Sequence, residues 1–247
     1  MLRVNDLSLR YPNGKLALTD FELTVEPGEL VAVLGGNGSG KTTLLRCITR
    51  TLRPSAGEIW LDETNLCALE GEKLRRARLA LAIIWQHPSL VRRRTVLANV
   101  ATGALGRHST LWTTLGGLPA SELEPARSYL ADVGLADLAE QRAGTLSGGQ
   151  AQRVSIARAL AQRPRVLLAD EPVASLDPEA ADEIMRLLQR LARSERIAVL
   201  CVLHQLDLAY TYADRVVGIR AGRIAFNLPR SQVSREEVRQ LYIHEAA

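Results

Sequence analysis

A glycine-rich loop directly after an apolar run constrains this chain more than any other feature. Residues 35–42 read Gly-Gly-Asn-Gly-Ser-Gly-Lys-Thr and fit the pattern GxxxxGK[ST] without a mismatch. The preceding run Leu30–Leu34 is continuously apolar, which is typical of a strand buried on both faces of a parallel sheet. A helical stretch with Leu44, Leu45 and Ile48 follows. The order strand, loop, helix is the one that a phosphate-binding loop requires, so a chance glycine-rich turn is a much weaker explanation.

The loop predicts a site for a nucleoside triphosphate. Glycines let successive backbone N–H groups converge on phosphate oxygens, and the following helix adds its positive end. We expect Lys41 to reach the β- and γ-phosphates of ATP, and the hydroxyl of Thr42 to hold Mg²⁺. The candidate ATP-binding residues of this segment are Gly35, Gly36, Asn37, Gly38, Ser39, Gly40, Lys41, Thr42 and Thr43.

A second apolar segment ends in two carboxylates. Residues 165–170 read Arg-Val-Leu-Leu-Ala-Asp, and Glu171 comes next. In a phosphate-loop protein, the acidic residue at the end of such a strand binds Mg²⁺, usually through water, which is the role we expect for Asp170. Glu171 is the candidate general base that orients the attacking water. The plainer alternative is that the pair only ends a strand before Pro172, and it loses weight beside a phosphate loop.

A Ser-Gly-Gly segment indicates a second anion site. Residues 146–150 read Leu-Ser-Gly-Gly-Gln and precede an amphipathic helical pattern, so Ser147, Gly148, Gly149 and Gln150 are expected at a helix N-terminus, which attracts anions. One chain cannot readily use two such sites on one triphosphate. This pattern therefore suggests that each nucleotide lies between two chains.

Together these motifs resemble the ATP-binding-cassette family, whose signature motif matches residues 146–150 and caps the nucleotide of the opposite subunit. The resemblance implies that Gln86 touches Mg²⁺ and the attacking water, and that Asp177 lies in the loop through which the subunits communicate. It also implies that His204 bonds the γ-phosphate and that Tyr11 stacks on adenine. By themselves, these four residues read as a surface amide, a helix cap, a structural histidine and a strand-end aromatic residue.

Segments outside the shared motifs resemble the ATPases of phosphonate importers. They are residues 141–143, 169–178 and 204–209, and a glycine-rich insert at 103–118 that contains Ser-Thr-Leu-Trp at 109–112. His87 and Pro88 depart from the pattern, because an aromatic residue or Asn is expected there, and residues 90–94 are unusually basic. These departures leave the identity of the permease open. The resemblance also leaves the cargo open between phosphonates, related oxyanions and other small solutes.

Composition excludes several classes of protein. At 47% hydrophobic and 23% charged, the 247 residues suit a soluble globular fold, and no apolar run approaches the roughly 20 residues of a membrane-spanning helix. We expect no leader peptide. Cys47, Cys67 and Cys201 lack metal-ligand or disulfide spacing. The net charge of +4 is spread along the chain, so we expect no nucleic-acid partner.

The sequence thus predicts an α/β fold with a phosphate-loop NTPase core built on a parallel sheet, an N-terminal antiparallel β subdomain and an inserted α-helical signature subdomain. The core is expected at residues 1–84 and 160–227, the helical subdomain at 85–159 and a C-terminal tail at 228–247. Residues 216–224 are expected to form a hairpin that turns at Ala221 and Gly222.

The resemblance implies a homodimer at the cytoplasmic face of the inner membrane, with permease subunits and a separate solute-binding protein. Two alternatives are weighed against it. A soluble cassette of ribosome or DNA metabolism usually joins two cassettes or carries a long coiled-coil insert, and neither is present. A nonhydrolytic binding module is disfavoured by the presence of Lys41, Asp170, Glu171 and His204 together.

Overall fold

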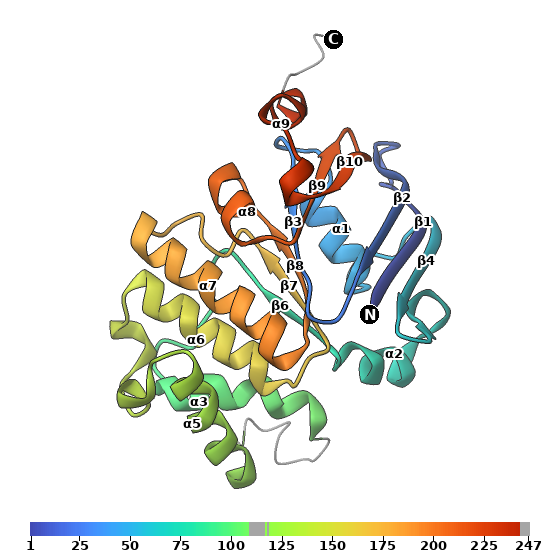
Figure 1. The fold of residues 1–247 in the computed structure, drawn as a ribbon. Coiled ribbons are helices and arrows are strands. Elements are labelled where there is room, and N and C mark those ends of the chain that lie inside the picture. Colours follow the sequence, from blue (N-terminus) through green and yellow to red (C-terminus); the bar gives the residue numbers. More distant parts are fainter. Residues whose placement is uncertain (109–116, 118, 243–247) are drawn as a thin grey trace.

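Two β-sheets and a group of helices make up the fold in the computed structural model, which describes residues 1–108, 117 and 119–242 (Figure 1). The larger sheet has the strand order β10 (Arg223–Pro229), β9 (Arg215–Arg220), β3 (Leu30–Leu34), β8 (Ala198–Val202), β7 (Val166–Asp170), β6 (Leu81–Ile84). The smaller sheet has the order β2 (Leu16–Val25), β1 (Leu2–Arg10), β4 (Ala56–Leu61), β5 (Thr64–Asn65). The Ser-Thr-Leu-Trp stretch of the predicted insert lies outside the described residues.

The central strands of the larger sheet are buried on both faces, as the sequence predicts. In β3, Leu30, Ala32 and Leu34 face one apolar cluster, whereas Val31 and Val33 face a second cluster between the two sheets. Strands β3, β8, β7 and β6 pair in parallel, so their carboxyl ends meet at one edge of the sheet. That edge is where an open α/β sheet normally binds its ligand. The predicted neighbourhood of the strands at residues 30–34, 165–170 and 197–203 is confirmed.

The N-terminal strands form the predicted antiparallel subdomain. β1 pairs with both β2 and β4. In β2, the buried residues Phe21, Leu23 and Val25 alternate with more exposed ones. Helix α1 (Lys41–Ile48) lies between the two sheets (Figure 1) and buries Leu44, Leu45 and Ile48 in their shared core. Full burial of each such side chain contributes roughly 1.5–3 kcal/mol.

Helices cover the other face of the large sheet and extend beyond its β6 edge. The helical subdomain contains α3 (Val96–Ala101), α5 (Leu123–Asp132) and α6 (Gly148–Ala161), with short 3₁₀ turns η2 (Thr102–Arg107), η3 (Ala120–Glu122), η4 (Ala136–Leu138) and η5 (Ala143–Thr145). The remaining covering helices are α7 (Pro178–Glu195) and α8 (Leu206–Tyr212). On the smaller-sheet side lie η1 (Leu66–Ala68) and α2 (Gly71–Arg78). The exact division of the chain at residues 84 and 160 stays a prediction.

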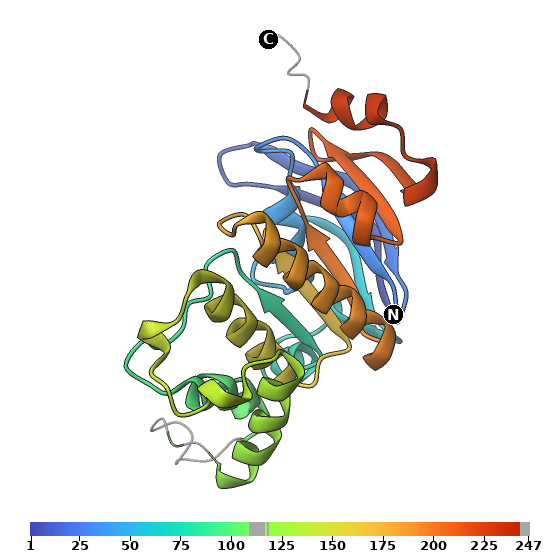
Figure 2. The same ribbon diagram turned by 60° about the vertical axis from the view of Figure 1, so that its left-hand side comes forward.

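The predicted hairpin is present, and the C-terminal tail packs back on the core. β9 and β10 turn at Ala221 (φ 47°) and Gly222 (φ 76°), the two positive φ angles of a tight hairpin turn. The tail forms η6 (Arg230–Gln232) and α9 (Arg235–Leu241), whose Val238 and Leu241 are buried. Figure 2 shows α9 and the helical subdomain at opposite ends of the molecule. In the described part of the chain, no helix combines the length and apolarity that crossing a bilayer requires.

Candidate functional site

The phosphate loop joins β3 to α1 in a conformation that needs glycine. Gly38 and Gly40 have φ angles of 77° and 112°, and a Cβ atom on Gly40 would lie 2.7 Å from the carbonyl oxygen of Ala17. Lys41 is buried, and its Nζ donates hydrogen bonds to the carbonyl oxygens of Gly35 (2.8 Å) and Gly36 (2.9 Å). Burial lowers the pKa of Lys41, although Glu171 and Asp170 oppose that shift. A cation is thus held inside a loop of backbone groups.

Two more segments support the loop from outside. The amide N–H of Gly222, in the β9–β10 turn, donates to the carbonyl oxygen of Ser39 at 2.9 Å. Tyr242 follows α9, and its hydroxyl contacts the backbone of Gly35, a bond that opposes the rise in the pKa of Tyr242 caused by burial. Sequence reasoning missed both contacts, because a hairpin turn and a tail residue carry no phosphate-binding pattern.

A cleft of about 290 Å³ lies beside the loop. Ser39 Oγ is buried there without a partner among the described residues, so a polar group of a ligand would satisfy it. The cleft brings together much of the predicted site and adds Lys15, which sequence reasoning missed because an isolated lysine in a turn has no distinguishing pattern. Its lining residues are Tyr11, Lys15, Ala17, Asn37, Gly38, Ser39, Gly40, Lys41, Thr42, Thr43 and Glu171.

Thr42 and Asp170 meet at the floor of this site. Thr42 Oγ1 donates to Asp170 Oδ1 at 3.4 Å, and the Asp170 side chain is buried. The pKa of Asp170 is raised, first by burial and then by the like charge of Glu171. A divalent cation would relieve this crowding of negative charge. The described structure has no group of three or more His, Cys, Asp or Glu that could hold a metal ion.

Glu171 and His204 are in direct contact. Glu171 follows β7, its φ is 52°, and its amide donates to the carbonyl oxygen of Val202 in β8 at 3.2 Å. His204 comes two residues after β8, and its Nε2 lies 2.5 Å from Glu171 Oε1. The adjacent strand ends therefore place the predicted general base and the predicted phosphate-binding histidine within hydrogen-bond reach.

Tyr11 stands at the rim of the cleft. Its hydroxyl and Thr43 Oγ1 are 3.1 Å apart, which fixes the ring against the start of α1. The ring is part of the cleft wall, so its predicted stacking role is geometrically accessible.

Several predicted site residues are not among those that line the cleft of this single chain. Gly35, Gly36, Asp170 and His204 contact or adjoin residues of the lining, whereas Gln86, residues 147–150 and Asp177 lie in other segments. Gln86 is exposed in the loop after β6. Ser147 caps α6 in a full capping box, because its Oγ accepts from Gln150 N at 3.2 Å and Gln150 Oε1 accepts from Ser147 N at 2.9 Å. Asp177 caps α7, accepting from Ala180 N at 2.9 Å. A Cβ on Gly149 would lie 3.4 Å from the Cβ of Ala180, so the two capped helix ends pack side by side.

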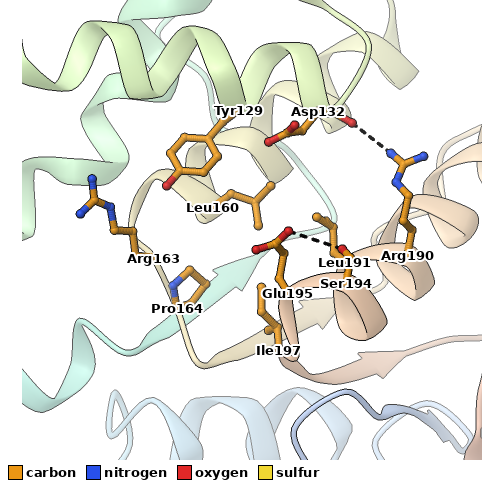
Figure 3. A pocket seen from close by; sticks show the side chains of 10 residues that line it. All are labelled: Tyr129, Asp132, Leu160, Arg163, Pro164, Arg190, Leu191, Ser194, Glu195 and Ile197. Atoms are coloured by element: carbon orange, nitrogen blue, oxygen red, sulfur yellow. Dashed lines mark hydrogen bonds between the residues drawn. The ribbon is translucent and has the colours of Figure 1, made fainter.

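A different cavity, of about 570 Å³, lies between α5, α6 and α7 (Figure 3). Leu160, Leu191 and Ile197 contribute its apolar wall, and Arg190 bonds the carbonyl oxygen of Asp132 at its rim. None of the predicted nucleotide-site residues lines it. The chemistry therefore belongs to the smaller cleft at the phosphate loop.

Comparison with known proteins identifies the family. Residues 18–174, which contain the phosphate loop, residues 146–150 and the pair Asp170 and Glu171, match the ABC transporter family. The chain belongs to the ABC transporter family. As one of its cassettes it is an ATP-hydrolysing transport ATPase, and the predicted α/β phosphate-loop fold is confirmed.

Relatives of this ABC ATPase match it along nearly its whole length. The phosphonates import ATP-binding protein of Wolinella succinogenes is 42% identical over 99% of this chain and 89% of its own. The protein of the same description from Shouchella clausii is 43% identical over 98% of this chain and 91% of its own.

Solved structures agree with the fold of this ABC ATPase. The cbiO1 protein of Clostridium perfringens, part of the ABC transporter complex cbiONQ, superposes with a TM-score of 0.84 at 31% identity, covering 97% of this chain and 92% of its own. A cassette solved as a dimer in a post-hydrolysis state, bound to ADP and Pi, gives a TM-score of 0.80 at 28% identity, covering 93% of this chain and 99% of its own.

Proposed function

We propose that this chain powers an importer of phosphonates or a related oxyanion, as a homodimer bound to a separate permease at the cytoplasmic face of the inner membrane. One observation carries the proposal: the phosphate loop, Asp170, Glu171 and His204 converge at the carboxyl ends of three adjacent parallel strands. This arrangement suits phosphoryl transfer to water, because every group surrounds the place where a γ-phosphate would lie.

Each side chain receives a distinct role in hydrolysis. Lys41, released from the carbonyl oxygens of Gly35 and Gly36, binds the β- and γ-phosphates. Glu171 holds the attacking water and accepts its proton, while His204 turns from Glu171 to the γ-phosphate. Thr42 and Asp170, with Gln86, are the proposed protein ligands of Mg²⁺, directly or through water. When bound, the ion neutralises charge on the phosphate oxygens.

Dimerisation completes the site. Ser147, Gly148, Gly149 and Gln150 lie at the start of α6, away from the cleft lining of their own chain. In the proposed dimer they cap the nucleotide held by the partner subunit, and Asp177 lies beside them at the interface. The similar cassette solved as a dimer after hydrolysis supports the dimer itself. Two ATP molecules then act as ligands that bind the closed dimer better than the open one.

A groove of about 560 Å³ is the proposed docking site for a cytoplasmic helix of the permease. It runs between the end of α1, α2, β6, η2 and α6, beside the Gln86 loop. Leu79 and Ile83 supply apolar surface, whereas Arg75 and Arg78 offer charge. Arg92, Arg93 and Arg94 lie farther along the same loop and could contact the permease or lipid.

The cargo follows from the relatives rather than from the cleft. Proteins named phosphonates import ATP-binding proteins match this chain over nearly its full length. In importers of this kind, a separate solute-binding protein and the permease select the solute. The cargo is therefore a property to test on those partners.

Three measurements test the proposal. Co-expressed with its permease, the chain should co-purify in detergent, and its ATPase activity should rise when the loaded binding protein is added. The binding protein should show a thermal shift with phosphonates, phosphite or phosphate. A shift only with amino acids or metal ions would refute the cargo but leave the ATPase intact. Recovery only in the soluble fraction, without permease, would refute the transport role.

A further inference from the structure

Helix α6 holds the Gln86 loop at two points. The Nε2 of Gln152 donates to the carbonyl oxygen of Trp85 at 3.3 Å, one residue before Gln86. Arg158, two turns farther along α6, donates to the carbonyl oxygens of Pro88 at 2.7 Å and Ser89 at 3.1 Å. Gln86 and His87 therefore lie between two anchors that belong to one helix.

Gln152 and Arg158, the two anchors, both have polar groups in unusual surroundings. Gln152 is 1% exposed, and its Oε1 is buried without a hydrogen-bond partner in the described structure. The hydrogen-bond partners of Arg158 in the described chain are neutral oxygens, the third being Ser155 Oγ at 3.4 Å. Burial lowers the pKa of Arg158. Arg158 is half-buried, and its guanidinium bonds two consecutive carbonyl oxygens of the loop, so this contact fixes the loop backbone at Pro88 and Ser89.

The rest of the loop is tied to the helical subdomain as well. Asn99 of α3 is 1% exposed and bonds both the N–H (2.7 Å) and the carbonyl oxygen (3.1 Å) of Val91. The amide of Gly144 donates to the carbonyl oxygen of Arg92 at 3.0 Å. A displacement of α6 and α3 therefore carries the loop with it.

We infer that Gln152 and Arg158 form a loop clamp, a pair of positioning residues that set where Gln86 stands relative to the nucleotide. The inference rests on the proposed role of Gln86 in hydrolysis. Because α6 begins at Ser147, contact of Ser147 with the nucleotide of the partner subunit moves the same helix that holds the loop. Arg158 also lines the proposed permease groove, so the loop clamp connects that groove to Gln86.

The test combines kinetics with a double-mutant cycle. Arg158→Met and Gln152→Met should each lower kcat by about tenfold or more, because small misplacements of catalytic groups cost up to about 100-fold. The affinity for a fluorescent ATP analogue should stay within about twofold, since neither residue lines the cleft. Arg158→Lys, which keeps the positive charge and N–H donors but not the planar guanidinium, should recover part of the lost turnover.

A matched control comes from the same helix. Arg153 forms an ion pair with Glu183 of α7 and has no hydrogen bond to the loop in the described structure, so Arg153→Met removes an arginine contact of the same helix that does not reach the loop. Any change in its melting temperature measures the loss of an arginine contact on α6, and its kcat should stay nearly unchanged. Equal losses of kcat in Arg153→Met and Arg158→Met would show a general stability effect and overturn the loop clamp.

A double-mutant cycle that combines Arg158→Met with Gln86→Ala distinguishes failure of the loop clamp from failure of the proposed role of Gln86. Gln86→Ala alone should lower kcat, and Arg158→Met should then add little, because the residue it positions is gone. If the double variant instead loses kcat by the product of the two single losses, the loop clamp is overturned and the role of Gln86 is left intact. An unchanged kcat in Gln86→Ala would overturn both the role of Gln86 and the loop clamp, whereas the ATPase assignment itself depends on Glu171.

Discussion

Glu171 Oε1 and His204 Nε2 lie 2.5 Å apart, although 33 positions separate the two residues in the sequence. The contact arises because β7 and β8 are adjacent parallel strands, so the residues beyond their carboxyl ends emerge side by side. Glu171 and His204 thus bond each other in this structure. In the proposed mechanism Glu171 holds the attacking water and His204 bonds the γ-phosphate, so we expect ATP binding to separate the two side chains.

Replacing the base should stop turnover without preventing binding. Glu171→Gln should lower kcat by at least about 100-fold, the usual loss of a general base, while ATP affinity is kept. Because the proposed cycle releases the dimer only on hydrolysis, this variant should elute as a dimer in Mg-ATP during size-exclusion chromatography. Glu124→Gln, an exposed acid on α5 with 87% side-chain exposure, is the control and should behave as the unchanged protein. Normal turnover of Glu171→Gln, or a monomer at saturating Mg-ATP, contradicts the mechanism.

Two serine residues that cap helices allow a controlled test of the proposed nucleotide site between two subunits. Ser147 and Ser234 each cap a helix in a capping box, so replacing either by Ala should cost about 1 kcal/mol of stability. Only Ser147→Ala should also lower ATPase activity. Mixing inactive Lys41→Ala and Ser147→Ala chains should restore activity, because one of the two sites in a mixed dimer has both halves intact. A mixture that stays inactive would mean that each chain builds its own site.

Tyr11 should act through its ring rather than its hydroxyl. Tyr11→Ala is expected to weaken ATP binding by about 10- to 100-fold, as loss of a base-stacking side chain does. Tyr11→Phe removes only the bond to Thr43 and should bind nearly as well as the unchanged protein. Titration with a fluorescent nucleotide measures both. Equal losses in the two variants would assign the effect to the hydroxyl.

An ion cluster in the helical subdomain should give a pH-dependent stability. Glu122 is buried and contacts Arg107 (2.8 Å) and His108 (2.7 Å). Burial by itself raises the pKa of Glu122, but the hydrogen bonds from His108 and Arg107 outweigh it and hold the pKa below its ordinary value. A lowered carboxyl pKa stabilises the fold above the unfolded value of about 4.3, and that contribution fades as pH falls through the folded value.

Glu122→Gln should therefore destabilise the protein by about 1–3 kcal/mol at pH 7, and by less at an acidic pH below the unfolded pKa of about 4.3. Urea unfolding at the two pH values measures the difference. Glu124→Gln, the exposed neighbour, should show little change at either pH. A penalty of equal size at both pH values would exclude the charge of Glu122 as its source.

The buried strands were the most predictable part of the fold. The run Leu30–Leu34 forms β3 with the predicted limits, because a strand buried on both faces must be apolar throughout and the glycine loop ends it. Contact of Thr42 with Asp170 follows from the same logic, since both residues lie at the carboxyl edge of one sheet. Patterns that arise from burial and backbone geometry are legible in the sequence.

Contacts that depend on packing between distant segments were not predictable. Lys15 enters the cleft because the turn after β1 folds beside α1, and nothing in its neighbours marks it. Arg158 reads as one more helical arginine until its bonds to the carbonyl oxygens of Pro88 and Ser89 are known. A side chain that bonds a backbone carbonyl oxygen does not restrict which residue carries that carbonyl. Such a contact therefore produces no recognisable sequence motif.

The position of β6 at the edge of the large sheet has a consequence for how this architecture can diversify. The helical subdomain departs from that rim strand, so only one ladder, between β6 and β7, borders the insertion. Changes to parts of the insert away from Gln86 and residues 147–150 leave β3, β7 and β8 paired as before, and these are the strands next to Lys41, Asp170 and His204. An insertion at this edge can therefore alter the surface offered to a partner without disturbing the strands behind the phosphate loop.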